Sequence, residues 1–183
     1  MPRTSRWIAA ALSLAVAVSL SACVTEPEPP PRTSSATPAP DSVFESDADA
    51  LAAAIEAYEA YVSVSDSVAR GGASDLSRFK EVATPEYAEV LIRDARGFQD
   101  ADLRRSGTST FDTATLAAHN DAAVQIYLCA DVSETRVLNS EGIDITPTDR
   151  PVRVPLLLSF AIDPSDNSLL LESSDAWADE HYC

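Results

Sequence analysis

The chain has 183 residues, of which 13 are basic and 29 acidic, so its formal net charge at pH 7 is −16. A surface this acidic repels phosphate groups, which excludes nucleic acid and anionic lipid headgroups as expected partners. The sequence has no G-x-S-x-G, no H-E-x-x-H and no glycine-rich phosphate loop. We therefore expect no catalytic residues, no metal ligands and no cofactor.

The first 22 residues have the order of a secretory signal peptide. Two arginines precede an uncharged apolar run that ends at Leu20 and is too short to cross a bilayer as a helix. The run leads into Leu20-Ser21-Ala22-Cys23, which resembles the lipobox of bacterial lipoproteins. The resemblance implies that residues 1–22 are removed and that the sulfur of Cys23 carries a diacylglyceryl group with acyl chains such as palmitate. It also implies that this lipid anchors the protein to the extracytoplasmic face of the cell membrane.

Residues 23–42 are expected to be a tether. Six of the twelve prolines lie between Val24 and Pro40, and this composition is typical of an extended spacer rather than a core. Residues 43–183 then form the folded domain, because this length is enough to bury a single hydrophobic core.

The cysteine count predicts a disulfide. Lipidation of Cys23 leaves Cys129 and Cys183 of the three cysteines. An even number of cysteines in an oxidising compartment favours pairing. We expect a bond that ties a mid-domain strand to the last residue, and the alternative is two unpaired thiols, one buried and one on a loose tail.

Three helical segments open the domain. The first begins at a Ser46 cap, has apolar residues at helical spacing as far as Ala69, and places Asp66 among the polar residues between them. A short second segment begins near Asp75. The third begins at Thr84, a capping residue followed by proline at the first helical position.

The pattern changes to strands after Thr108, and residues 110–118 are the first candidate. A turn leads to the clearest strand, residues 122–132, which alternates strictly. Its aliphatic row runs from Val124 to Val132, and its opposite face carries Gln125, Tyr127, Cys129 and Asp131.

Shorter patterns complete the sheet. Residues 136–138 and 143–145 flank a turn and predict a hairpin. Residues 152–162 follow, and Pro155 argues for an edge strand or a bulge there. Residues 169–177 are the last strand.

Helices followed by antiparallel strands predict an α+β fold with N-terminal helices packed on one face of a curved sheet. The element order and length over Ser46–Cys183 resemble the NTF2-like superfamily, in which such a sheet forms a cone with a cavity. The strand Leu128–Ser133 is also similar to exported lipoproteins of high-GC Gram-positive, actinobacterial-type bacteria. A cystatin-like fold is the structural alternative.

The NTF2-like resemblance makes Tyr127 and Asp131 a possible site. Isomerases and cyclases of this fold use a carboxylate base with a hydrogen-bonding partner inside the cavity, where burial raises the pKa of an aspartate. No motif of those enzymes lies on these positions. The alternative is a solvated sheet face.

We therefore expect a lipid-anchored extracytoplasmic domain that is not an enzyme and that binds a small apolar ligand or an envelope protein. The alternatives are a cavity enzyme of the isomerase, dehydratase or cyclase type and a structural dimerisation module, and the oligomeric state stays open. A polar cavity with a raised carboxylate pKa would favour the enzyme. A dry apolar cavity would favour ligand binding, and a filled cone would favour the structural role.

Overall fold

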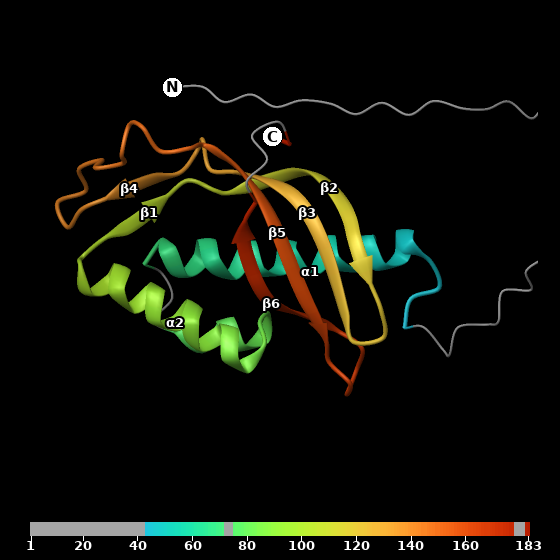
Figure 1. The fold of residues 1–183 in the computed structure, drawn as a ribbon. Helices are drawn as coiled ribbons and strands as arrows, with labels where there is room; N and C mark the ends of the chain where they lie inside the picture. The colour runs from blue at the N-terminus through green and yellow to red at the C-terminus, as the bar shows by residue number, and fades with distance from the viewer. Residues whose placement is uncertain (1–42, 72–74, 178–181) are drawn as a thin grey trace, which may run out of the picture. The chain divides into compact units, whose positions relative to one another are not determined.

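The computed structural model (Figure 1) describes residues 43–71, 75–177 and 182–183, all within one compact unit. The expected signal peptide, residues 1–22, and the expected tether, residues 23–42 with Cys23, lie outside the described residues. Helical elements come first and strands follow. Within the part of the chain that is described, no helix combines the length and the apolar character that crossing a bilayer requires.

Helix α1 (Asp47–Ala69) begins at the predicted cap. The backbone N–H of Asp49 donates to the Ser46 hydroxyl at 3.2 Å, which satisfies one of the donors left unpaired in the first helical turn. The helix presents the small residues Ala50 and Ala54, together with Tyr58, to the core. Because two of these side chains are so small, the helix can lie close against the sheet.

Two further helical segments follow. The 3-10 helix η1 (Leu76–Glu81) begins after the cap Asp75, and α2 (Pro85–Asp100) begins after the cap Thr84, both as predicted. The hydroxyl of Thr84 accepts from the Tyr87 N–H at 3.3 Å. Helix α2 is amphipathic and buries Ala88 and Ile92.

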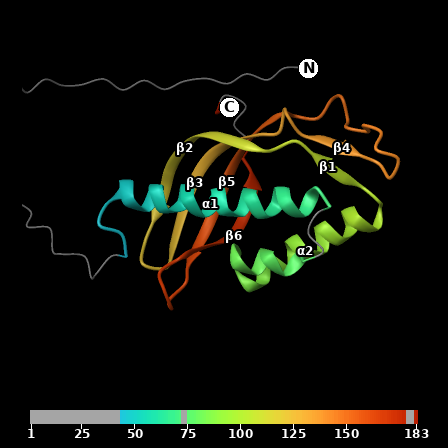
Figure 2. The same ribbon diagram turned by 180° about the vertical axis from the view of Figure 1, so that it is seen from behind.

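The main sheet has four antiparallel strands in the order β2-β3-β5-β6. These are β2 (Thr110–His119), β3 (Ala123–Asp131), β5 (Arg153–Ile162) and β6 (Leu169–Ala176). Two short strands, β1 (Arg104–Ser106) and β4 (Arg136–Leu138), pair as a separate ribbon beyond β2 and β3. Figures 1 and 2 show α1 and α2 on the same face of the bent sheet.

Irregular pairing accompanies the bend of the sheet. The register between β2 and β3 shifts between Asp112 and Thr115, where Thr113 has a φ of 56°, and again between Leu116 and Ala118. Bulges of this kind increase local twist and bend a strand. The predicted fold class is thereby confirmed: N-terminal helices pack on a curved antiparallel sheet, an arrangement consistent with the NTF2-like fold.

The core confirms which face of β3 meets the helices. Val124, Ile126 and Leu128 are completely buried. They pack in one cluster with Leu158 and Phe160 of β5 and with the apolar side chains of α1. Since full burial of an aliphatic side chain contributes about 1.5–3 kcal/mol, this row accounts for much of the contact between sheet and helices.

The interpretation of Pro155 as a mark of an edge strand or bulge is wrong, because β5 lies between β3 and β6 and pairs regularly with β3 at this residue. The N–H of Trp177 donates to the Pro155 carbonyl at 2.9 Å, so this carbonyl points toward the β6 side. In an antiparallel strand the nitrogen and the carbonyl of one residue point to the same side, so the nitrogen of Pro155 points away from β3 as well. The ladder of β6 ends at Ala176. The missing N–H therefore removes no hydrogen bond between β3 and β5.

The predicted hairpin of residues 136–138 and 143–145 forms only in part. Along one edge, β4 pairs with β1. Along its other edge, only Leu138 pairs with the second predicted strand, through an isolated bridge to Asp144. The hydroxyl of Thr146 accepts from the Val137 N–H at 2.8 Å. A side chain therefore supplies the acceptor that a regular second strand would provide.

Candidate ligand-binding cavity

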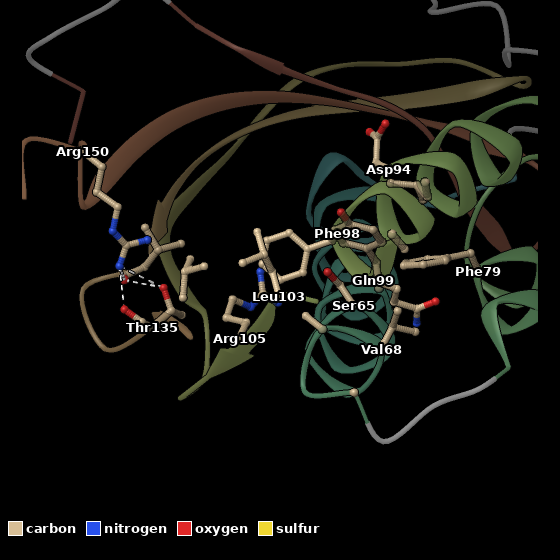
Figure 3. Close-up of a pocket in the computed structure, with 17 residues that line it drawn as sticks. Ser65, Val68, Phe79, Asp94, Phe98, Gln99, Leu103, Arg105, Thr135 and Arg150 are labelled. Atoms are coloured by element: carbon tan, nitrogen blue, oxygen red, sulfur yellow. Dashed lines mark hydrogen bonds between the residues drawn. The ribbon is translucent and has the colours of Figure 1, made fainter. Parts of the chain in front are cut away.

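Two adjoining cavities lie between the helices and the sheet, and Figure 3 shows the larger one. The larger has a volume of about 390 Å³ and the smaller about 270 Å³. They share the wall formed by Tyr61, Ser65, Arg105 and Val132. The rest of the larger cavity is mainly apolar, with walls from Val68, Phe79, Leu91, Ala95, Phe98, Leu103 and Val137.

A buried carboxylate stands beside this shared wall. The side chain of Asp66, in the last turn of α1, is only 6% exposed. It accepts hydrogen bonds from the Arg105 guanidinium and from Ser109, whose N–H and hydroxyl lie at 3.0 and 3.1 Å. Arg70 lies 3.9 Å away on its exposed side. The carboxylate is thus held by hydrogen-bond donors from β1 and from the loop that follows β1, and by an ion pair with the residue that caps the end of α1.

The expectation that Asp66 is one of the polar residues between the apolar positions of α1 is wrong. The residue lies four positions after Val62 and three before Ala69, so it shares their side of the helix. This spacing was a signal available in the sequence. The prediction failed because a carboxylate is placed inside only when donors compensate it, and those donors are 39 and 43 residues away along the chain.

Arg105 reaches the cavity from the short strand β1. Its side chain is 24% exposed and lines both cavities. One terminal nitrogen binds Asp66, whereas its Nε is buried and no described residue accepts a hydrogen bond from it. No sequence motif marks this arginine, because its position depends on the pairing of β1 with β4.

Gly107 allows β1 to lie where it does. Its φ is +83°, and a Cβ on this residue would stand 2.0 Å from the Glu134 carbonyl oxygen. No other residue type fits so close an approach of two backbones. The glycine therefore lets the chain pass closely by the turn before β4 and brings Arg105 to the cavity.

Arg150 closes another part of the larger cavity (Figure 3). Its Nη2 donates to the carbonyl oxygens of Val132 and Thr135, at 2.8 and 2.6 Å, and to the Thr135 hydroxyl at 3.1 Å. These bonds hold the turn between β3 and β4. Asp94 of α2 also lines this cavity, from an exposed position.

The tyrosines of the cavity wall stay neutral. Burial raises the pKa of Tyr58 and of Tyr61 above the ordinary value for a phenol. Their hydroxyl groups therefore remain protonated at physiological pH. They offer hydrogen bonds without adding negative charge to the cavity.

The structure places Tyr127 and Asp131 outside the cavity, on the opposite face of β3. The ring of Tyr127 lies 4.3 Å from that of Trp177 and 6.1 Å from that of Tyr182. Asp131 binds Arg153 at 3.1 Å. Hydrogen bonds from Ser133, and then Arg153, lower the pKa of the Asp131 carboxyl. This carboxylate stays ionised beside an arginine, which is the opposite of a buried aspartate that moves protons.

Cys129 and Cys183 lie at disulfide-forming distance, with their Cα atoms 5.5 Å apart. Cys129 is completely buried although it faces away from the helices. Tyr182 lies over the same face, and its hydroxyl donates to the Thr113 carbonyl at 2.6 Å. The described end of the chain therefore packs on the outer face of the sheet, where the sequence predicts it.

Comparisons with known proteins show the fold alone. No family model matches the chain, and no curated protein has a similar sequence. Among solved structures, the intermembrane space region of the chloroplast protein ARC6 has 8% identity and a TM-score of 0.52 over 70% of this chain and 97% of that chain. A protein from Catenulispora acidiphila has 17% identity and a TM-score of 0.44 over 69% and 91%. A designed β-sheet protein has 10% identity and a TM-score of 0.36 over 73% and 95%.

Proposed function

We propose that this chain is a lipid-anchored extracytoplasmic domain that binds a small, mostly apolar ligand in its cavity without catalysing a reaction. The observation that carries the proposal is the larger cavity, because its volume of about 390 Å³ lies within the range of about 300–1,000 Å³ found for ligand pockets. Its walls are mainly apolar, with a few polar groups that could orient a ligand.

The polar groups favour binding over isomerase or dehydratase chemistry. A general base needs a carboxylate that is free to take a proton from the substrate. Asp66 is instead bound to Arg105 and Ser109, and Asp131 lies on the other face of the sheet. Asp66 and Asp131 therefore act as structural partners of arginines and hydroxyl groups, whereas Asp94 lines the larger cavity from an exposed position.

Filling the cavity should abolish binding of a neutral apolar probe. Leu91→Trp places a larger side chain into the wall of the larger cavity. We expect it to weaken binding of the neutral dye N-phenyl-1-naphthylamine by at least about 10-fold, which corresponds to about 1.4 kcal/mol. Dye fluorescence measures the affinity, and circular dichroism checks that the variant folds.

Leu157→Trp is the matched control, because Leu157 pairs with Tyr127 on the outer face of the sheet. It should leave the affinity for the dye unchanged. Equal weakening by the two variants, or a wild-type protein that binds no dye, would contradict the proposed function.

Anchoring is tested separately. The motif Leu20-Ser21-Ala22-Cys23 supports lipidation, and a cysteine pair at disulfide distance is compatible with an oxidising, extracytoplasmic compartment. We expect the wild type to enter the detergent phase in Triton X-114 partitioning and Cys23→Ala to stay in the aqueous phase. Cys183→Ala should partition as the wild type does. A Cys23→Ala protein that still enters the detergent phase would show that the lipobox interpretation is wrong.

A further inference from the structure

The guanidinium of Arg105 has a donor that lacks an acceptor. One of its terminal nitrogens binds Asp66, but the Nε–H is buried and has no acceptor among the described residues. A buried N–H without an acceptor is costly, so such groups in folded proteins normally meet an oxygen. Because Arg105 lines both cavities and its side chain is 24% exposed, a molecule inside them can bring an oxygen to the exposed part of the guanidinium.

The charge beside Arg105 is positive despite Asp66. Two guanidinium groups, those of Arg105 and Arg70, lie within 4 Å of this one carboxylate. Ser109 supplies two further donors to it. Asp66 is therefore fully engaged and holds Arg105 in place. Arg150 and Asp94 also line the larger cavity, so three arginines stand against two aspartates and one positive charge is left over, in a chain whose formal net charge is −16. A single negative charge on a ligand fits this balance.

The surroundings of the guanidinium are apolar on the cavity side. Figure 3 shows Arg105 among the residues that line the larger cavity, which include Leu103, Phe98 and Val68. A ligand whose oxygen reaches the exposed part of the Arg105 guanidinium would have its remaining atoms against this wall. The site thus calls for one charged end and an apolar body.

We propose that the cavity binds a fatty-acid-type monocarboxylate, with its carboxylate on Arg105 and its hydrocarbon chain along Leu91 and Phe98. The inference rests on the proposed function and names its ligand class. A carboxylate forms a charge-assisted hydrogen bond with an arginine N–H. A phosphate ester carries two negative charges, whereas only one positive charge beside Arg105 is uncompensated. The second negative charge would be repelled by the carboxylates of Asp66 and Asp94.

Decanoate and 1-decanol test the assignment, because they differ only in the charged end. We would titrate each into the full-length chain carrying Cys23→Ala and follow displacement of the neutral dye. A hydrogen bond to a charged group is worth a factor of roughly 10–100 in affinity. We expect decanoate to bind by about that factor more tightly than 1-decanol.

Arg105→Lys is the discriminating variant, since it keeps a positive charge near Asp66 but removes the planar guanidinium and its donors. It should weaken decanoate binding by about 10-fold or more and leave 1-decanol binding within about 2-fold. Arg153→Lys is its control, because Arg153 bridges Asp112 and Asp131 on the outer face. It should change neither affinity.

The outcomes separate the two proposals. Equal affinity of the wild type for decanoate and 1-decanol overturns the carboxylate assignment and leaves the apolar cavity function standing; this comparison needs no variant to fold. Unchanged decanoate affinity in a folded Arg105→Lys protein overturns the assignment as well, because the guanidinium would then contribute nothing to carboxylate binding that a lysine does not. Failure of both compounds and of the dye to bind overturns both proposals.

Discussion

Reduction of the bond expected between Cys129 and Cys183 should lower the free energy of unfolding of the domain by roughly 4 kcal/mol in the chain-entropy model. The two cysteines are 54 residues apart in sequence, so the bond closes a long loop in the unfolded chain. The total stability of a domain of this size is only about 5–15 kcal/mol. At about 2–4 °C per kcal/mol, the melting temperature should fall by about 10 °C.

The bond also has a local effect in the folded state. It holds the described end of the chain beside Tyr127, where Trp177 and Tyr182 pack on one another and on Tyr127. Loss of the bond should therefore expose this aromatic cluster, and tryptophan fluorescence should shift on reduction.

Intact mass before and after thiol alkylation shows whether the bond is present in the exported protein. Cys183→Ser supplies the control, because its melting temperature should equal that of the reduced wild type and should not respond to reductant. Two alkylated thiols in unreduced protein, or an unchanged melting temperature on reduction, would contradict the prediction.

Asp66→Ala is expected to destabilise the domain by about 3–5 kcal/mol, which is the usual cost of leaving a buried charge without its partner. The substitution takes the acceptor away from the largely buried Arg105 and from the N–H of Ser109. It should lower the midpoint of urea unfolding strongly. Because β1 then lacks its tie to α1, the dye affinity of the cavity should fall as well.

Asp112→Ala is the matched control. Asp112 also binds an arginine, Arg153, at 2.8 Å, but its side chain is 52% exposed on the outer face of the sheet. Exposed ion pairs contribute little because water solvates both charges. A similar urea midpoint for the two variants would show that burial of Asp66 does not carry the effect.

Local chemistry explains what could be predicted from the sequence. The caps Ser46 and Thr84 place the starts of both α-helices, since a capping side chain acts within three residues of itself. Alternation likewise places Val124 on the core face of β3 and Cys129 on the other, because neighbouring side chains of a strand point to opposite faces. Such signals need no knowledge of distant residues.

The cavity and its charged wall were decided by tertiary structure. Asp66 can be buried only because Arg105 and Ser109 arrive from distant parts of the chain to donate to it. Pro155 fits an inner strand only because the neighbouring strand ends beside it, at Ala176. The sequence by itself determined the helices and the four strands of the main sheet in their order, through interactions between near neighbours, but it did not predict β1 or its pairing with β4. Which polar groups meet inside the domain depends on contacts across dozens of residues, and these exist only once the sheet has curved over the helices.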